Sequence, residues 1–170
     1  MLNSLAETDE YNALGIPKNI QETKSIIEVW TEASKLPKIK NYTSIIEKKL
    51  DIEFIGLFEL KLGAKKYNRG EVWYKIHSDF WGNGFATEAL QAVIHFGFET
   101  IKLYRIEARC AVNNVASIKV LEKTGMTREG RGRQVLPLNM GGRIVMNIPF
   151  LRLMKGKQGN IYKNNFYTLK

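Results

Sequence analysis

Apolar and polar residues recur along the first part of the chain with the periods of one helix and two strands. Residues 42–47 and 52–62 alternate and are rich in β-branched and aromatic residues, which predicts a hairpin with its turn at 48–51. In the second strand, Gly56 indicates a bulge or a close approach of two backbones. Before the hairpin, residues 20–35 have helical spacing and predict an amphipathic helix. One side of that helix is expected to carry Ile26, Ile27, Trp30 and Ala33.

A strand, a glycine turn and a helix follow one another at the centre of the chain. Residues 71–77 alternate like a strand, and residues 84–101 are apolar nearly all round, as in a buried helix. Gly82 and Gly84 between them can adopt left-handed backbone angles. The first turn of a helix presents unpaired backbone N–H groups at its positive end. This pattern predicts a phosphate site, although a lone pair of glycines is equally typical of an ordinary turn.

Another strand and helix come next. Cys110 falls on the apolar side of the strand predicted at 104–112, so packing is favoured over a role as a nucleophile. Residues 114–124 predict a helix with Asn114 as its N-cap and Gly125 just beyond its end. The two faces of the strand carry Ile106, Ala108, Cys110 and Val112 on one side, and Glu107, Arg109 and Ala111 on the other.

The C-terminal part allows two arrangements of strands. Residues 127–138 predict a strand, and 143–151 predict its return after a turn at 139–142. Pro149 weakens the returning strand, because proline belongs at strand ends and edges. Residues 160–169 are an alternative for the last strand.

The order of these elements predicts an α/β fold with a mixed sheet. No repeat, low-complexity tract or linker divides the chain, so residues 1–170 are expected to form a single domain. Residues 151–170 are then either a basic tail or the final strand.

Composition restricts the location and the chemistry. The 170 residues contain no apolar run of about 20, and the first ten are acidic rather than signal-like, which favours a cytoplasmic location and no membrane partner. One cysteine and two histidines give no internal disulfide and no cysteine-rich or histidine-rich metal centre, so no metal is expected.

Charge is distributed unevenly along the chain. The formal net charge is +9, and no acidic residue follows Glu129. Such a cationic region can favour a polyanionic cofactor, an acidic protein substrate or RNA, or it can be a solvated tail without a partner. Nucleic acid is the less favoured of these partners. The basic residues after Glu129 include Arg131, Arg133, Arg143, Arg152, Lys155, Lys157, Lys163 and Lys170.

The glycine turn differs from two common nucleotide motifs. It lacks the Gly-Lys-Ser/Thr ending of a P-loop, and Thr87 stands where a dinucleotide fingerprint has its third glycine. The ordered blocks instead resemble the GNAT acetyltransferase superfamily, and within it the ribosomal-protein N-terminal (alanine/serine) acetyltransferases. The blocks are residues 81–89, 105–108, 114–117, 121–126 and 128–130.

The resemblance implies a mixed, mostly antiparallel twisted sheet flanked by helices, with the first family strand missing from this chain. It also implies acetyl-CoA as co-substrate, bound where the strands ending at His77 and Val112 diverge. The pantetheine arm is then expected at Ile76 and His77, and the pyrophosphate on Gly82, Asn83, Gly84, Phe85 and Ala86. Asn114 and Ser117 are expected at the CoA arm and beside the thioester sulfur.

Catalysis is less clearly implied. The position where many superfamily members have a tyrosine acid is Leu121, so Ser117 is the candidate for assisting the departure of sulfur. The backbone N–H near Ile76 or His77 is the expected oxyanion donor. Positions where relatives carry a glutamate base are Arg109 and Leu136 here. Glu71 and Glu107 are therefore the candidate bases, with a water relay as the alternative.

The sequence thus predicts an acetyl-CoA-dependent N-acetyltransferase acting by direct attack within a ternary complex. The favoured acceptor is the α-amine of a protein N-terminus. The alternatives are a small-molecule acceptor, such as a polyamine or an aminoglycoside, and a catalytically weak acyl-CoA-binding or RNA-binding module. A homodimer is possible, because loss of the first strand exposes a sheet edge.

Overall fold

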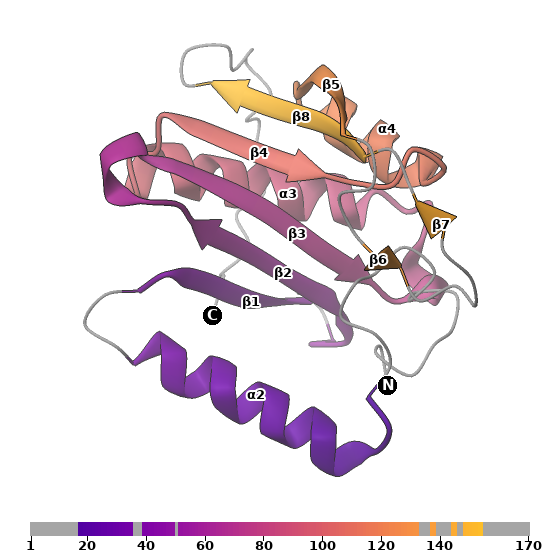
Figure 1. Cartoon of the computed structure of the whole chain (residues 1–170). Helices are drawn as coiled ribbons and strands as arrows, with labels where there is room; N and C mark the ends of the chain where they lie inside the picture. The colour runs from indigo at the N-terminus through magenta and orange to yellow at the C-terminus, as the bar shows by residue number, and fades with distance from the viewer. Residues whose placement is uncertain are drawn as a thin grey trace.

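A computed structural model describes residues 17–35, 39–49, 51–132, 137–138, 144–145 and 148–154. Within these ranges the chain forms a six-stranded sheet in the order β1-β2-β3-β4-β8-β5, and β6 and β7 form a separate pair (Figure 1). The strands are β1 (Asn41–Glu47), β2 (Phe54–Leu62), β3 (Arg69–Ile76), β4 (Arg105–Arg109), β5 (Thr127–Gly132), β6 (Pro137–Leu138), β7 (Ile144–Val145) and β8 (Ile148–Met154).

Helices and short helical turns connect these strands. The longest α-helices are α2 (Ile20–Ser34) before β1 and α3 (Phe85–His95) between β3 and β4. A π-helical turn, η4 (Phe96–Thr100), continues α3, and α4 (Val115–Lys123) joins β4 to β5. Two 3-10 turns flank β3, namely η2 (Lys65–Tyr67) and η3 (Ser78–Phe80).

The pairing of β3 with β4 is parallel, whereas the other described pairs in the large sheet are antiparallel. This confirms the predicted mixed, mostly antiparallel sheet. The parallel register begins at Arg69 with Arg105 and ends at Val72 with Ala108. Since β3 continues to Ile76, its last four residues pair with β2 alone among the described strands. The two strands therefore part at the centre of the sheet.

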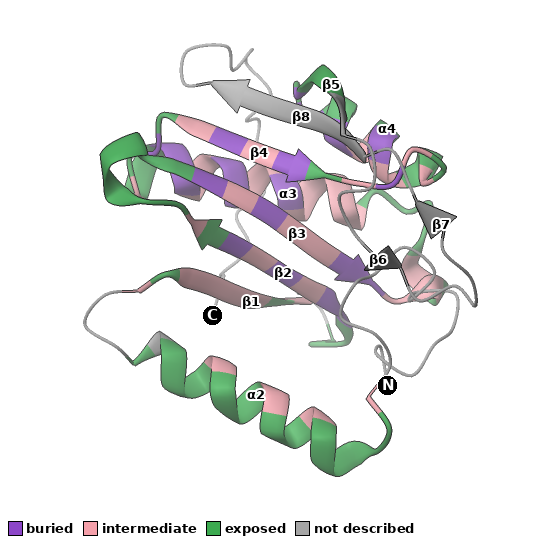
Figure 2. Ribbon diagram, viewed as in Figure 1, coloured by how far each residue is buried: buried purple, intermediate pink, exposed green. Residues whose placement is uncertain are grey.

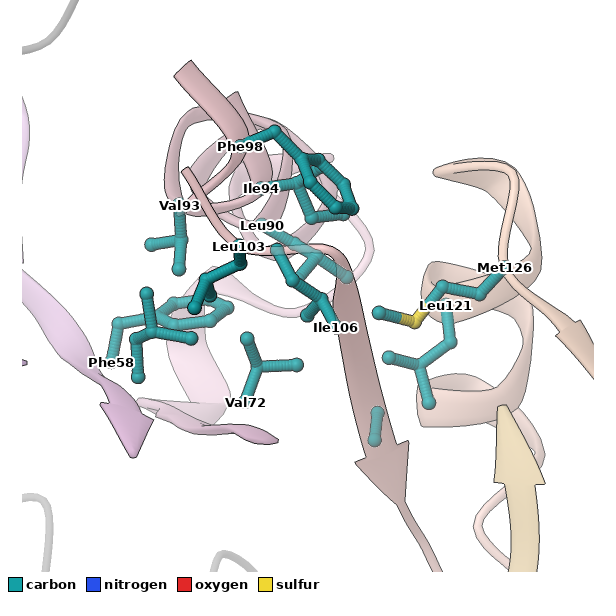
Figure 3. Packing of buried hydrophobic residues seen from close by; sticks show 12 residues of the cluster. Phe58, Val72, Leu90, Val93, Ile94, Phe98, Leu103, Ile106, Leu121 and Met126 are labelled. Atoms are coloured by element: carbon teal, nitrogen blue, oxygen red, sulfur yellow. The ribbon is translucent and has the colours of Figure 1, made fainter. Parts of the chain in front are cut away.

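The core lies between one face of the sheet and α3, which runs behind the strands in Figure 1. Figure 3 shows the side chains of α3 packed over β4, with Leu121 of α4 and the adjoining Met126 beside them. Gly56 is buried against β3, and an added Cβ there would lie 2.3 Å from the carbonyl oxygen of Lys75. The predicted close approach is confirmed. The cluster comprises Phe58, Leu60, Val72, Leu90, Val93, Ile94, Phe98, Leu103, Ile106, Ala108, Leu121 and Met126.

The predicted limits of helix α2 are correct, but two of the four residues expected on its apolar side are exposed. It contacts the edge strand β1, and Figure 2 shows most of its surface exposed. Ile26 and Trp30 are partly buried, as expected. Ile27, however, is 50% exposed and Ala33 is exposed. A helix that packs against one strand covers a narrow strip, and the prediction assumed a wider contact.

The remaining boundaries differ from the sequence-based prediction in identifiable ways. The strand predicted at 104–112 ends at Arg109, so Cys110 and Val112 lie beyond it. The helix predicted to Ile101 changes to a π-turn after His95. The returning strand is β8, where Pro149 pairs with β5 alone and not with β4, as befits a strand end. The prediction that the first family strand is missing concerns the start of the chain, and residues 1–16 lie outside the described residues, as do the turn at 139–142 and the alternative strand at 160–169.

Among the described residues, the longest helices are too short or too polar to cross a lipid bilayer.

Candidate active site

The glycine turn before α3 has the backbone shape that the sequence predicted. Gly82 and Gly84 have left-handed φ angles of 77° and 85°. Gly84 is the N-cap of α3 and offers no side chain to cap it, so the N–H groups of the first helical turn point outward. A Cβ built on either glycine meets no atom within 4 Å. The turn is thus an open surface lined by backbone donors, which suits a phosphate group.

The segment between β3 and this turn is held in place by side-chain and backbone hydrogen bonds. Trp81 donates its indole N–H to the carbonyl oxygen of Ile76 over 2.8 Å, and the His77 N–H donates to the carbonyl oxygen of Ile55 over 2.8 Å. The imidazole of His77 accepts from the Asp79 N–H at 3.4 Å. His77 therefore fixes the chain on both sides, and its N–H is already used.

Alternation along β3 shows which groups face the diverging strand. Because the backbone of His77 bonds to β2, the N–H and C=O groups of Ile76 and Tyr74 point to the β4 side. The Ile76 carbonyl is taken by Trp81. The Ile76 N–H faces the divergence and is a better candidate for an oxyanion donor than the N–H of His77.

The start of α4 lies across the divergence from β3. Asn114 is the N-cap, and its Oδ1 accepts the Ser117 N–H at 3.0 Å, as the sequence predicted. The Ser117 hydroxyl lies 2.7 Å from the hydroxyl of Tyr74 on β3. Burial raises the pKa of Tyr74 to about 12, opposed in part by the bond to Ser117. The structure thus brings Asn114 and Ser117 together, and it adds Tyr74.

Sequence reasoning left open which of Trp73 and Tyr74 enters the core. Tyr74 packs against the core cluster, and its ring stacks on Phe58 with a centroid distance of 5.2 Å. Trp73 alternates to the opposite face of the sheet. Leu121, at the position of the family's tyrosine acid, is 1% exposed within the core and carries no titratable group. The tyrosine that contacts Ser117 comes from β3 and not from α4.

The two candidate bases lie on the face of the sheet opposite the core, and each is paired with an arginine. Glu71 receives two hydrogen bonds from the guanidinium of Arg109, one of them 2.6 Å long. Glu107 receives a hydrogen bond from Arg105, with Arg69 at 3.9 Å. Strand alternation separates both carboxylates from Tyr74 and Ser117, which lie on the core side. The structure therefore does not bring Glu71 or Glu107 to the Tyr74–Ser117 pair.

A third carboxylate on the same face was missed by sequence reasoning. Glu59 of β2 stands opposite Trp73 in the antiparallel register. Burial raises the pKa of Glu59, and the neighbouring charge of Glu71 adds to this increase while Lys61 opposes it. In the sequence, the alternation of polar and apolar residues along β2 was the feature that could have placed Glu59 on this face. A carboxylate that holds its proton more tightly is a candidate for proton transfer.

The raised pKa of Glu59 predicts a pH-dependent loss of stability. The folded chain holds the Glu59 proton more tightly than the unfolded chain does. Stability therefore falls as pH rises from the pKa of Glu59 in the unfolded chain to its higher pKa in the folded chain, and the loss persists at neutral pH. Glu59→Gln is expected to raise Tm by about 1–2 °C at pH 7, and the gain should shrink near pH 4. Thermal melts at both pH values measure this. Glu28→Gln, on the exposed face of α2, is the control. A gain of equal size at pH 4 would contradict the prediction.

Cys110 is partly buried among core residues, and burial raises its pKa to about 11. The thiol is therefore protonated at neutral pH, in agreement with a packing role.

Beside the glycine turn, the tip of the β1–β2 hairpin supplies a cation. The Lys48 ammonium lies 5.1 Å from the centroid of the Phe80 ring, which precedes the turn. Glu53 neutralises much of this charge, because its carboxylate accepts a hydrogen bond of 2.5 Å from Lys48. A phosphate on the turn would thus depend mainly on backbone N–H groups and on the helix end.

Comparison with known proteins agrees with the resemblance to GNAT acetyltransferases that the sequence showed. A family model described as an acetyltransferase (GNAT) domain matches residues 2–127. The uncharacterized N-acetyltransferase p20 of Bacillus licheniformis is 34% identical over 112 residues, which are 66% of this chain and 62% of that protein. The putative ribosomal N-acetyltransferase YdaF of Bacillus subtilis is 35% identical over 89 residues, which are 52% of this chain and 49% of that protein.

Solved structures share the fold. The spermidine N-acetyltransferase of Vibrio cholerae, in complex with CoA and spermine, matches with a TM-score of 0.78 at 20% identity, over 92% of this chain and 87% of that one. At this identity the likeness concerns the fold alone. The family match, however, covers most of the chain and confirms the resemblance found in the sequence. The chain belongs to the GNAT family of acetyltransferases.

Proposed function

We propose that this protein transfers an acetyl group from acetyl-CoA to the α-amine of a protein N-terminus. The observation that carries the proposal is the open glycine turn, with its left-handed Gly82 and Gly84, directly beside the stretch of β3 that leaves β4. The turn fits a pyrophosphate and the free strand edge fits a pantetheine arm. The start of α4, with Asn114 and Ser117, then lies at the thioester end.

The proposed reaction is a direct attack. The neutral amine adds to the thioester carbon, the Ile76 N–H stabilises the oxyanion, and the C–S bond breaks with its electron pair on sulfur. Ser117 donates a hydrogen bond to that sulfur. Because the sheet is open where β3 and β4 part, the amine can approach from the ion-paired face while sulfur faces Ser117.

The charges on the ion-paired face favour a single amine over a polyamine. Among the described residues, Glu71, Glu107 and Glu129 are each paired with an arginine, so these carboxylates are not available to a flexible polycation. The similarity to a putative ribosomal N-acetyltransferase supports the same choice. The likeness to a spermidine enzyme, which concerns the fold, keeps spermidine as the second candidate.

The ion pairs also bear on the general base. Glu71 accepts two arginine N–H groups and Glu107 accepts one, and the arginine charge favours the ionised form of each carboxylate. We therefore expect Glu71→Gln and Glu107→Gln to leave the pH dependence of kcat unchanged. Stability should fall by about 0–1 kcal/mol in each variant. The pH profiles of the two variants and of Glu59→Gln would be compared. Loss of the acidic limb, the fall of kcat at low pH, in Glu71→Gln or Glu107→Gln would make that residue the base, and its loss in Glu59→Gln alone would select Glu59.

The acceptor is tested by CoA release from acetyl-CoA with a panel of amines. Peptides starting with alanine or serine, the same peptides with a blocked α-amine, spermidine and an aminoglycoside are compared at equal concentration. The proposal expects release with the free peptides alone. Release with spermidine and not with peptides would select the second candidate. Absence of release with every acceptor, despite CoA binding, would favour the binding-module alternative.

A further inference from the structure

One side-chain contact spans the divergence of β3 and β4 without being part of any motif. The hydroxyls of Tyr74 and Ser117, 43 positions apart, lie 2.7 Å from each other in a partly buried place. This contact links the strand that ends near the glycine turn to the first turn of α4. It lies where the proposed function places the sulfur of acetyl-CoA.

Both partners are fixed independently of their contact. The Tyr74 ring stacks on Phe58 at an interplanar angle of 24°, and Phe58 is itself 1% exposed. The Ser117 backbone is held by the Asn114 side chain, which accepts its N–H. Stacking holds the tyrosine ring, and the N-cap hydrogen bond holds the serine backbone. The two hydroxyls therefore have little freedom to move apart. The contact is therefore preorganised before any substrate binds.

The direction of the hydrogen bond decides what Ser117 can do. A serine hydroxyl has one hydrogen, and a tyrosine hydroxyl also has one. If Ser117 donated to Tyr74, its hydrogen would be consumed within the protein. If Tyr74 donates, Ser117 accepts with a lone pair and its own hydrogen remains available. Because burial raises the pKa of Tyr74 to about 12, the phenol keeps its hydrogen at neutral pH and can serve as the donor.

We infer that Tyr74 is a positioning residue that donates to Ser117 Oγ and thereby directs the Ser117 hydrogen to the departing sulfur of CoA. The inference rests on the proposed function. As the C–S bond breaks, the electron pair moves to sulfur, the Ser117 O–H bonds to the thiolate, and no proton leaves Tyr74. A thiol is a much stronger acid than this phenol, so transfer of the tyrosine proton to the thiolate is unfavourable. The attacking amine loses its proton to water or to a base, and the thiolate is protonated from solvent.

The first test is a double-mutant cycle. Tyr74→Phe removes the hydroxyl and keeps the stacked ring, and it is expected to lower kcat by about 5- to 10-fold. In a Ser117→Ala background the same change should have no further effect, because the serine hydrogen that Tyr74 directs is already absent. Tyr42→Phe, on a ring packed edge-on against Phe96, is the matched control with unchanged kcat. Equal losses from Tyr74→Phe in both backgrounds would overturn the inference.

The second test needs no acceptor. Ultraviolet absorbance near 240 nm follows ionisation of the CoA thiol bound to the protein, with the titration of the protein alone subtracted to remove Cys110. The Ser117 hydrogen bond should lower the pKa of the bound thiol, and Tyr74→Phe should raise it by about 0.5–1 unit. This shift can be present even if every acceptor in the panel fails, so the two proposals can be separated. An unchanged thiol pKa in a Tyr74→Phe protein that binds CoA overturns the inference, and failure of the unaltered protein to bind CoA overturns both proposals.

Discussion

Gly84→Ala is expected to weaken acetyl-CoA binding by at least roughly tenfold. A non-glycine residue at a φ of 85° costs about 1–2 kcal/mol. In addition, the new Cβ occupies the open space in front of the turn, where no protein atom lies within 4 Å and where the pyrophosphate is proposed to bind. Calorimetric titration with acetyl-CoA and with CoA measures the loss. Both ligands should lose affinity equally, because they share the pyrophosphate.

Gly125→Ala is the control that distinguishes backbone strain in Gly84→Ala from a direct effect on acetyl-CoA binding. Gly125 has a φ of 86° at the end of α4, so alanine there carries a similar strain. It lies after the C-terminal end of that helix, away from the N-terminal turn with Asn114 and Ser117. We expect the two variants to lose similar stability and Gly84→Ala alone to lose affinity. Equal affinities for acetyl-CoA in both variants would mean that the pyrophosphate does not bind at the glycine turn before α3.

Ser117→Ala is expected to lower kcat by roughly 10- to 100-fold at saturating acetyl-CoA, with little change in KM. A hydrogen bond to a charged group contributes about 1.5–3 kcal/mol, and this one forms to sulfur as charge develops. The Asn114 cap survives in the variant, because it binds the backbone N–H of residue 117 and not the hydroxyl. Steady-state CoA release measures both constants. Unchanged turnover at saturating acetyl-CoA means that Ser117 does not assist the departure of sulfur.

Local features of this site could be predicted from sequence because neighbouring residues determine them. The positive φ values of Gly82 and Gly84 follow from the strand–turn–helix pattern. The Asn114 cap and the C-terminal stop of α4 follow in the same way. Gly125 adopts a φ of 86°, and the Met126 N–H returns to the Leu121 carbonyl, which completes a Schellman motif. Each of these depends on a few consecutive residues.

Features that join distant segments could not be predicted in this way. The contact of Tyr74 with Ser117 depends on where α4 lands over β3, and the pair of Glu71 with Arg109 spans 38 positions. The latter follows from the parallel register, in which Glu71 faces Glu107 and Arg109 is two residues further along β4. Without that register, Glu71 was a reasonable free base. Glu107 is different, because its partner Arg105 lies two residues away on the same strand and could have been expected from strand alternation.

Helix-to-sheet packing produced the other errors. The spacing of Ile27 and Ala33 suits a helix buried along a broad face, but among the described elements α2 packs mainly against the edge strand β1. Similarly, the apolar run after His95 gave no sign that the helix widens to a π-turn, which places buried Gly97 and Phe98 against the core. Amphipathic spacing states which residues can be buried, and the neighbouring elements decide which are.

A crystal structure with CoA would show whether the glycine turn and the start of α4 hold the cofactor. We expect the pyrophosphate oxygens to lie within hydrogen-bonding distance of the backbone N–H groups of residues 84–86. We also expect the pantetheine arm along the free edge of β3 near Ile76, and the sulfur beside the Ser117 hydroxyl with Tyr74 still bound to it. A pyrophosphate bound away from the glycine turn, or a sulfur on the far side of the sheet from Ser117, would contradict this expectation.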